Sequence, residues 1–225
     1  MYENRPAIRY PGKKRFFMIY GGMRTATRWL NRMIADNKAV PGIFQHEGWQ
    51  PHKFDGIDRE WRTAGPGIYG AVGMSGFEHW QYIMREFKPK LAFLWREPVS
   101  HAKSILCHKS RASREKRNGP FESNFYKLFA IYEALLAYVD DHGLGSTHWH
   151  LEHYTTKDGF VELCDTLGIP LKSEITMIGK FNSTRPENRR PLSPYDDYVR
   201  DIIEMFPRCK AARAQALAKL EVASV

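Results

Sequence analysis

The sequence predicts an α/β fold, a mainly parallel sheet flanked by helices. Apolar runs of strand length alternate with amphipathic stretches of helix length. Turns of small residues or proline follow two of these strands directly and start the next helix. The chain has 225 residues, 43% of them hydrophobic and 13% aromatic, which is enough for one domain with a substantial core.

The expected elements follow the chain in order. They are a strand at 16–20, a helix from Thr25 to Asn37, a strand at 42–45, a polar loop through 66, a strand at 67–73, a helix at 77–87, a strand at 90–95, helices at 98–108 and 121–141, a strand at 147–151 and a helix at 157–168. Such alternation predicts that ligands bind at the carboxyl ends of the strands.

Several side chains in these elements are expected to pack in the core. In 121–141 the aromatic and aliphatic residues recur at helical spacing. We also interpret four tryptophans as packing residues rather than platforms for stacked bases: Trp29, Trp61, Trp80 and Trp95. Gly168 ends the helix at 157–168, because glycine adopts the left-handed conformation that closes many helices.

The turn after the first strand is a candidate phosphate cradle. Backbone N–H groups in the first turn of a helix lack partners inside it and point with the helix dipole at whatever lies in front. Thr25, Ala26 and Thr27 are small enough for a phosphate to approach the backbone, and the threonines carry hydroxyl donors. Arg24 and Arg28 supply positive charge.

A second candidate lies after the strand at 90–95. Arg96-Glu97-Pro98 ends this strand, and Ser104 follows eight positions after Arg96 in the next helix. Arg96 would leave the strand as a forked donor for a phosphate, and Ser104 would add a hydroxyl.

Both segments resemble motifs of the sulfotransferase family. The run from Arg24 through Trp29 to Leu30 is similar to the 5′-phosphosulfate loop, and Arg96 with Ser104 resembles the 3′-phosphate motif. Ala26 stands where the family more often has glycine, and its methyl group requires a negative φ there. Residues 149–154 and 167–170 resemble two weaker motifs. The resemblance spans about 14–205 and implies a single domain over 1–225 with a P-loop-like sulfotransferase fold, of a compact bacterial type.

The resemblance implies a metal-free, in-line transfer of a sulfuryl group. The donor would be 3′-phosphoadenosine 5′-phosphosulfate (PAPS), and the acceptor a hydroxyl or amine of a glycan, a lipid-linked sugar or a small metabolite. Arg24 and the backbone of 25–28, including Thr25, Ala26, Thr27 and Arg28, would stabilise charge on the leaving phosphate. The segment around Arg185 resembles a late polar segment that approaches the cofactor in many members, so Arg185 is a further candidate contact.

The general base is open among three residues. Glycan-modifying relatives use a glutamate after the second strand, which makes Glu47 the first candidate. His46 is the alternative, because adjacent side chains on a strand face opposite ways and only one would enter the site. Cytosolic relatives use a histidine before a short helix, and His79 lies just beyond that place.

The net charge indicates the kind of partner, and the cysteines indicate the compartment. The net charge of +9 predicts an anionic partner, and the basic loop at 109–120 would lie near the 3′-phosphate or form a flap over the site. Three cysteines without a Cys-x-x-Cys pair favour a reducing compartment. We expect a cytoplasmic protein without a membrane span, since there is neither a long apolar run nor an apolar signal core.

Other classes of protein fit less well. A magnesium-dependent nucleotide or sugar kinase needs Gly, four residues and Gly-Lys-Ser/Thr, a run that this sequence lacks. A nucleic-acid-binding module needs its basic residues on one face with exposed aromatics. A zinc site is not expected, because no cysteine or carboxylate cluster completes His148, His150 and His153. A non-catalytic anion-binding module of sulfotransferase type stays open.

Overall fold

The computed structural model describes residues 13–22, 24–40, 42, 44–46, 58–73, 77–106, 119–179 and 195–222, with the backbone alone at 44–46 and 77–79. Within these ranges five strands form one parallel sheet in the order β2-β3-β1-β4-β5. They are β1 (Arg15–Gly21), β2 (Phe44–His46), β3 (Ile68–Gly73), β4 (Lys90–Trp95) and β5 (Ser146–His150). The prediction of an α/β fold with a parallel sheet flanked by helices is confirmed.

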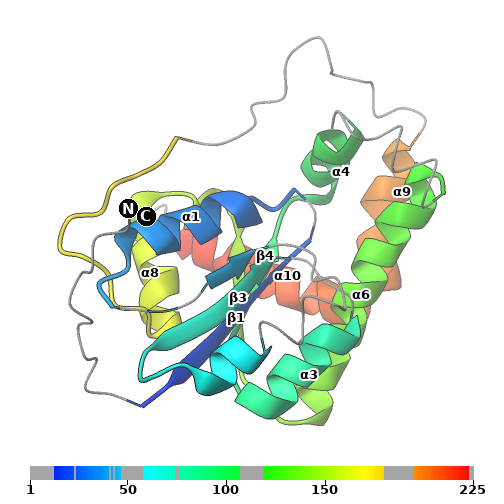
Figure 1. Cartoon of the computed structure of the whole chain (residues 1–225). Helices are drawn as coiled ribbons and strands as arrows, with labels where there is room; N and C mark the ends of the chain where they lie inside the picture. The colour runs from blue at the N-terminus through cyan, green and yellow to red at the C-terminus, as the bar shows by residue number, and fades with distance from the viewer. Residues whose placement is uncertain are drawn as a thin grey trace.

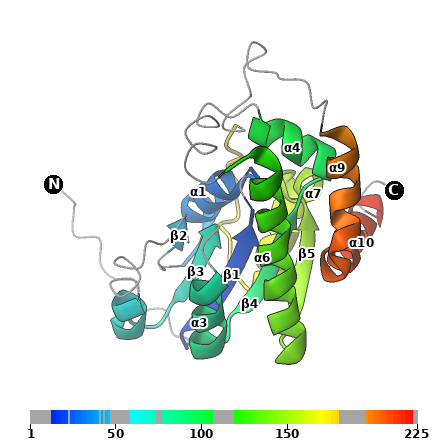
Figure 2. The same ribbon diagram turned by 90° about the vertical axis from the view of Figure 1, so that its right-hand side faces the viewer.

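Helices cover both faces of the sheet (Figure 1). One face carries α1 (Thr27–Asn37), α7 (Leu151–Tyr154) and α8 (Lys157–Leu167), and the other carries α3 (Phe77–Phe87), α4 (Pro98–Leu106), α6 (Phe121–Asp141), α9 (Asp196–Asp201), η2 (Ile202–Met205) and α10 (Pro207–Val222). Figure 2 shows the strands side by side behind α3 and α6, with α4 above their carboxyl ends.

The strands are buried on both faces, so each contributes to two hydrophobic clusters. Along β1, Phe17 and Ile19 pack with α1 and α8, whereas Met18 and Tyr20 pack with α3 and α6. This alternation follows from the twofold period of a strand. Continuous apolar runs are typical of parallel sheets covered on both sides.

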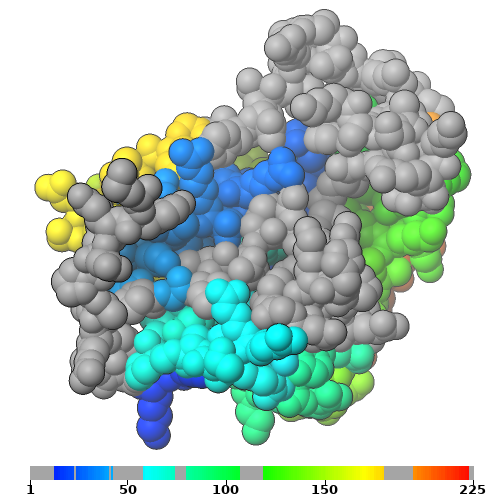
Figure 3. All heavy atoms as spheres, in the orientation of Figure 1, coloured from blue at the N-terminus to red at the C-terminus, as the bar shows by residue number. Residues whose placement is uncertain are grey.

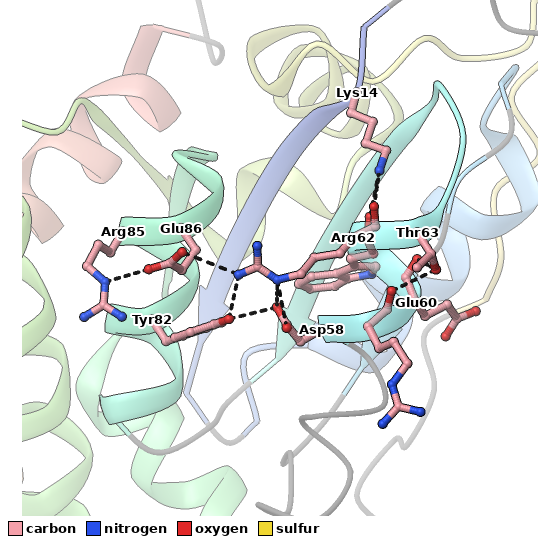
Figure 4. A network of polar contacts seen from close by, with 10 residues as sticks. Lys14, Asp58, Glu60, Arg62, Thr63, Tyr82, Arg85 and Glu86 are labelled. Carbon is pink, nitrogen blue, oxygen red and sulfur yellow. Dashed lines mark hydrogen bonds and ion pairs between the residues drawn. The ribbon is translucent and has the colours of Figure 1, made fainter.

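Residues 58–63 are helical, although the sequence predicted a polar loop there. Trp61 is buried against Phe16 and Phe87, and Lys14 donates to the carbonyl of Arg62 over 2.8 Å. Figure 4 shows how Arg62 continues into a polar network that ends on α3. One buried tryptophan therefore fixes a segment whose composition is otherwise that of a loop. Since Lys14 precedes β1, this network lies at the amino edge of the sheet.

The core continues past residue 205, where the sequence comparison with the sulfotransferases ended. In α10 the side chains of Cys209, Ala212 and Ala216 are buried against the sheet and α6. Lys219 from the same helix places Nζ 3.8 Å from the centre of the Trp149 ring. A buried stripe made mainly of alanine gives a weak apolar pattern, which is why sequence periodicity did not reveal this helix.

The connections of the sheet diverge between β1 and β4. The helix that follows β1 packs on one face, and the helices that follow β4 pack on the other. In open α/β sheets, ligands bind outside the carboxyl ends of the strands at such a switch point. Both phosphate motifs predicted from the sequence lie there. None of the helices in the described ranges has both the length and the apolar character needed to cross a membrane.

Candidate anion-binding site

The turn between β1 and α1 adopts an unusual backbone conformation. Arg24 has φ of 73°, and Ala26 has φ of 55° with ψ of 25°, so both lie in the left-handed region. The prediction of a negative φ at Ala26 is wrong. Ala26 is the residue that caps α1, and its carbonyl accepts the N–H of Leu30 over 3.0 Å. The left-handed conformation explains why glycine would suit this position.

This conformation makes the start of α1 suitable for an anion. A left-handed residue followed by a right-handed one turns successive backbone N–H groups toward a common point, here at Ala26 and Thr27. The positive end of the α1 dipole lies at the same place, and the first turn of α1 contains no acidic residue. Arg28 is exposed on this turn, and Figure 3 looks onto the surface where α1, in blue, is exposed.

The side chains of two predicted contacts are buried in the fold, as the sequence predicted for Trp29 but not for Thr25. The Thr25 hydroxyl is buried and donates to the carbonyl of Gly22 over 2.7 Å, so it closes the turn rather than facing a phosphate. Trp29 is buried beside Phe160 and donates from Nε1 to the carbonyl of Ile178 over 2.9 Å. Only the backbone of Trp29 remains as a contact for an anion. Thr27 is buried as well.

Arg96 at the end of β4 reaches the same turn. Its Nη1 donates to the carbonyl of Arg24 over 3.0 Å, and its Nε donates to the Ser100 hydroxyl over 3.0 Å. Burial lowers the pKa of Arg96, and nearby Tyr154, Glu97 and Glu152 oppose this shift. Arginine nevertheless stays charged at neutral pH. A guanidinium in surroundings that disfavour its charge gains from an added anion.

Glu97, between Arg96 and the helix, has a structural role that the sequence did not suggest. Its carboxylate accepts the N–H groups of Val99 over 2.9 Å and Ser100 over 2.6 Å. It thereby satisfies donors in the first turn of α4, as acidic residues commonly do at helix starts. An acidic residue directly before a helix-opening proline was the available signal.

Ser104 lies on α4 and joins the two motifs. Its Oγ accepts a hydrogen bond of 2.9 Å from Nε of Arg24, a residue 80 positions earlier. The side chain of Ser104 is 7% exposed. The structure therefore brings together Arg24, Arg96 and Ser104, which the sequence assigned to two different phosphates.

The structure describes no side chain for the three candidate bases or for Arg185. Glu47 and Arg185 lie outside the described residues, as does the basic loop apart from 119 and 120. His46 is described by its backbone alone, at the carboxyl end of β2 and paired with Val72. His79 is likewise described by its backbone alone, in α3. The roles of these residues stay predictions.

The histidines near β5 have separate surroundings. His148 accepts a hydrogen bond from Trp95 Nε1 over 3.2 Å, and His153 lies 2.8 Å from a carboxylate oxygen of Glu162. His150 is buried, and neither of its ring nitrogens has a hydrogen-bond partner among the described residues. The contacts of His148 and His153 thus involve different neighbours rather than one centre.

The fold and the site together define a parallel α/β protein with a basic candidate anion site at the carboxyl ends of β1 and β4. No family model matches the chain, and a search of curated proteins finds no match.

Proposed function

We propose that the protein is a PAPS-dependent sulfotransferase with a P-loop-like fold, acting on a hydroxyl or amine of a small molecule, a glycan or a lipid-linked sugar. The observation that carries this proposal is the hydrogen bond between Arg24 and Ser104, which joins two motifs that resemble the 5′- and 3′-phosphate motifs of one cofactor. The divergence of connections between β1 and β4 supports the same site.

The donor groups at the site fit a ligand with two phosphates. The backbone N–H groups at the start of α1 suit the 5′ end, which carries the sulfuryl group. The guanidinium of Arg96 and the hydroxyl of Ser104 suit a phosphate on the 3′ position. Arg24 contacts Ser104 and belongs to the loop itself, so its charge is available to both ends.

PAPS supplies the sulfuryl group and a phosphate as the leaving group. In this chain Arg24 and the N–H groups at the start of α1 would stabilise the charge that grows on that phosphate. Glu47 would accept the proton of the acceptor, with His46 and His79 as the alternatives. The protein must also hold both substrates in line, and residues at the ends of rigid strands are suited to this positioning.

We also propose a cytoplasmic location. The buried side chains of Cys164 and Cys209 are free thiols, which is typical of proteins kept in a reducing compartment.

Ligand binding without metal tests the proposal. The product 3′-phosphoadenosine 5′-phosphate (PAP) and ADP are titrated calorimetrically into the protein, each with EDTA and with magnesium. We expect PAP to bind much more tightly than ADP, with the same affinity in both buffers, since cations and N–H groups of the chain replace the metal. Magnesium-dependent binding that favours ADP would contradict the proposal and favour a kinase.

A further inference from the structure

Two buried tyrosines hold the 22–26 loop from opposite faces of the sheet. Tyr132 lies on α6 in the cluster that contains α3 and α10, and Tyr154 lies on α7 in the cluster that contains α1 and α8. Their side chains are 2% and 0% exposed. Each directs its hydroxyl to the backbone of the loop.

The Tyr132 hydroxyl bridges β1 and β4 where their pairing ends. It accepts the N–H of Gly22 over 2.6 Å and donates to the carbonyl of Leu94 over 2.7 Å. In the sheet, Leu94 is paired with Gly21, the last residue of β1. The hydroxyl therefore connects the start of the loop to the strand that directly precedes Arg96.

Tyr154 acts on the other end of the loop by donating to the carbonyl of Thr25. A trans peptide is planar, with its C=O and N–H on opposite sides. Holding the carbonyl of Thr25 toward Tyr154 therefore turns the N–H of Ala26 the opposite way. This N–H belongs to the group at the start of α1 that would face an anion.

Two further carbonyls among the described residues of the loop also have donors. The carbonyl of Gly22 accepts from the N–H and the hydroxyl of Thr25, and the carbonyl of Arg24 accepts from Arg96. Carbonyl oxygens repel an anion, so their orientation toward these donors favours a site lined by N–H groups. Tyr132 on α6 and Tyr154 on α7 supply the hydrogen bonds that the loop backbone makes with helices on the two faces of the sheet.

The backbone of the loop needs such support. Left-handed conformations are unfavourable for residues with a Cβ atom, and Arg24 and Ala26 both adopt them. Burial raises the pKa of Tyr132 and Tyr154, so both hydroxyls stay protonated and remain donors at neutral pH.

We propose that Tyr132 and Tyr154 are positioning residues that hold the loop in its anion-binding conformation before a ligand arrives. Affinity for a phosphate at the start of α1 then depends on two hydroxyls that need not touch that phosphate. The identity of the nucleotide rests on the proposed function, whereas the role of the tyrosines concerns the loop itself.

The test compares Tyr132→Phe and Tyr154→Phe with Tyr198→Phe. In the wild type the Tyr198 hydroxyl of α9 donates to the carbonyl of Glu122 in α6 over 2.9 Å. Tyr198→Phe is therefore the control, because it loses the same kind of hydrogen bond. Calorimetry measures the binding of PAP, adenosine 3′-phosphate and inorganic pyrophosphate to each variant. Thermal unfolding follows the folded fraction.

We expect each loop variant to bind PAP and pyrophosphate about tenfold more weakly, with adenosine 3′-phosphate changed by less than about twofold. The ratio of two dissociation constants within one variant cancels any unfolded fraction. Tyr198→Phe should bind all three ligands as the wild type does. A purely structural role would weaken all three ligands equally in the loop variants.

The possible outcomes bear on this inference and on the proposed function in different ways. Unchanged binding in both loop variants, or equal loss for all three ligands, overturns the positioning role while PAP binding by the wild type still supports a sulfotransferase. Pyrophosphate binding that depends on the hydroxyls, without PAP binding by the wild type, retains the positioning role and overturns the function. A wild type that binds none of the ligands overturns both.

Discussion

Nε of Arg24 lies 2.9 Å from Oγ of Ser104, although 80 positions separate these residues in the sequence. The guanidinium extends from the first loop to the helix after β4, where Arg96 returns a hydrogen bond to the Arg24 carbonyl. The two motifs are thus joined by hydrogen bonds that Arg24 and Arg96 donate.

This connection predicts that mutations of Arg24 and Ser104 have non-additive effects on the free energy of PAP binding. Arg24→Ala, Ser104→Ala and the double variant should show a coupling free energy of about 0.5–3 kcal/mol for PAP binding, because the residues share one hydrogen bond. Calorimetry on the four proteins measures it. As a control, Arg24→Ala is combined with Thr63→Ala, whose hydroxyl bonds to the carbonyl of Arg59 in the segment at the amino edge. Strict additivity for Arg24 with Ser104 would show that the contact has no energetic role.

The left-handed conformation of Ala26 predicts a stabilising substitution. Ala26→Gly should raise the free energy of unfolding by about 0.5–1 kcal/mol. Glycine adopts positive φ without the steric cost that alanine has, and this gain should exceed the loss from the greater entropy of glycine in the unfolded chain. Ala211→Gly is the matched control, because Ala211 is exposed within α10. The control should lose about 1 kcal/mol. Urea unfolding compares the two, and a loss in both variants would refute the strain at Ala26.

The sequence predicted the sheet and the placement of both motifs at the carboxyl ends of strands, but not the conformation of the loop. Strand runs and the turns after them are local patterns, so β4 and α6 have the bounds expected from the sequence. The value of φ at Ala26 depends on tertiary contacts. Tyr132 occupies a helical core position that looks like any packed aromatic residue, and only the three-dimensional structure shows its hydroxyl on Gly22.

The expected role of the Thr25 hydroxyl differs from the structure for a related reason. Thr25 has a residue type that suits an anion site, yet its hydroxyl is buried and donates to the carbonyl of Gly22, whereas Trp29 packs in the core as the sequence predicted. A motif specifies which residues are near a ligand, whereas packing decides which of their atoms face it. Arg96 and Ser104 lie beside the loop because β1 and β4 are neighbours in the sheet, a relationship that the alternation of elements predicted only as a shared edge.

Loss of the general base should affect turnover alone. Glu47→Gln should lower turnover by about 10²–10⁴ while PAP affinity stays near that of the wild type. Arg24→Ala should impair both, because Arg24 would contact the ligand before and during transfer. Radiolabelled sulfuryl transfer and calorimetry give the two quantities. Near-normal turnover in Glu47→Gln, with turnover lost in His46→Ala or His79→Ala, would move the role to that histidine.

The lowered pKa of His148 predicts that the stability of the protein depends on pH. Burial, followed by the positive charge of Lys219, lowers its pKa to about 4, and Asp140 opposes this shift. Between that value and the ordinary pKa near 6.5 the unfolded chain binds more protons, so stability falls as pH falls through this window.

The loss from this residue should be about 2 kcal/mol between pH 7 and pH 5. His148→Asn keeps an acceptor for Trp95 Nε1, the donor to His148 in the wild type, and removes the titration. Urea unfolding of both proteins across this range isolates the contribution of His148. Parallel curves for wild type and variant would contradict the assigned pKa.

A crystal structure of the protein with PAP tests the proposed site most directly. We expect the 5′-phosphate at the N–H groups of Ala26 and Thr27, and the 3′-phosphate on Arg96 and Ser104. We also expect the Tyr132 and Tyr154 hydroxyls to keep their bonds to the loop. PAP bound elsewhere on the chain, or with its 3′-phosphate away from Arg96, would contradict the assignment of this site.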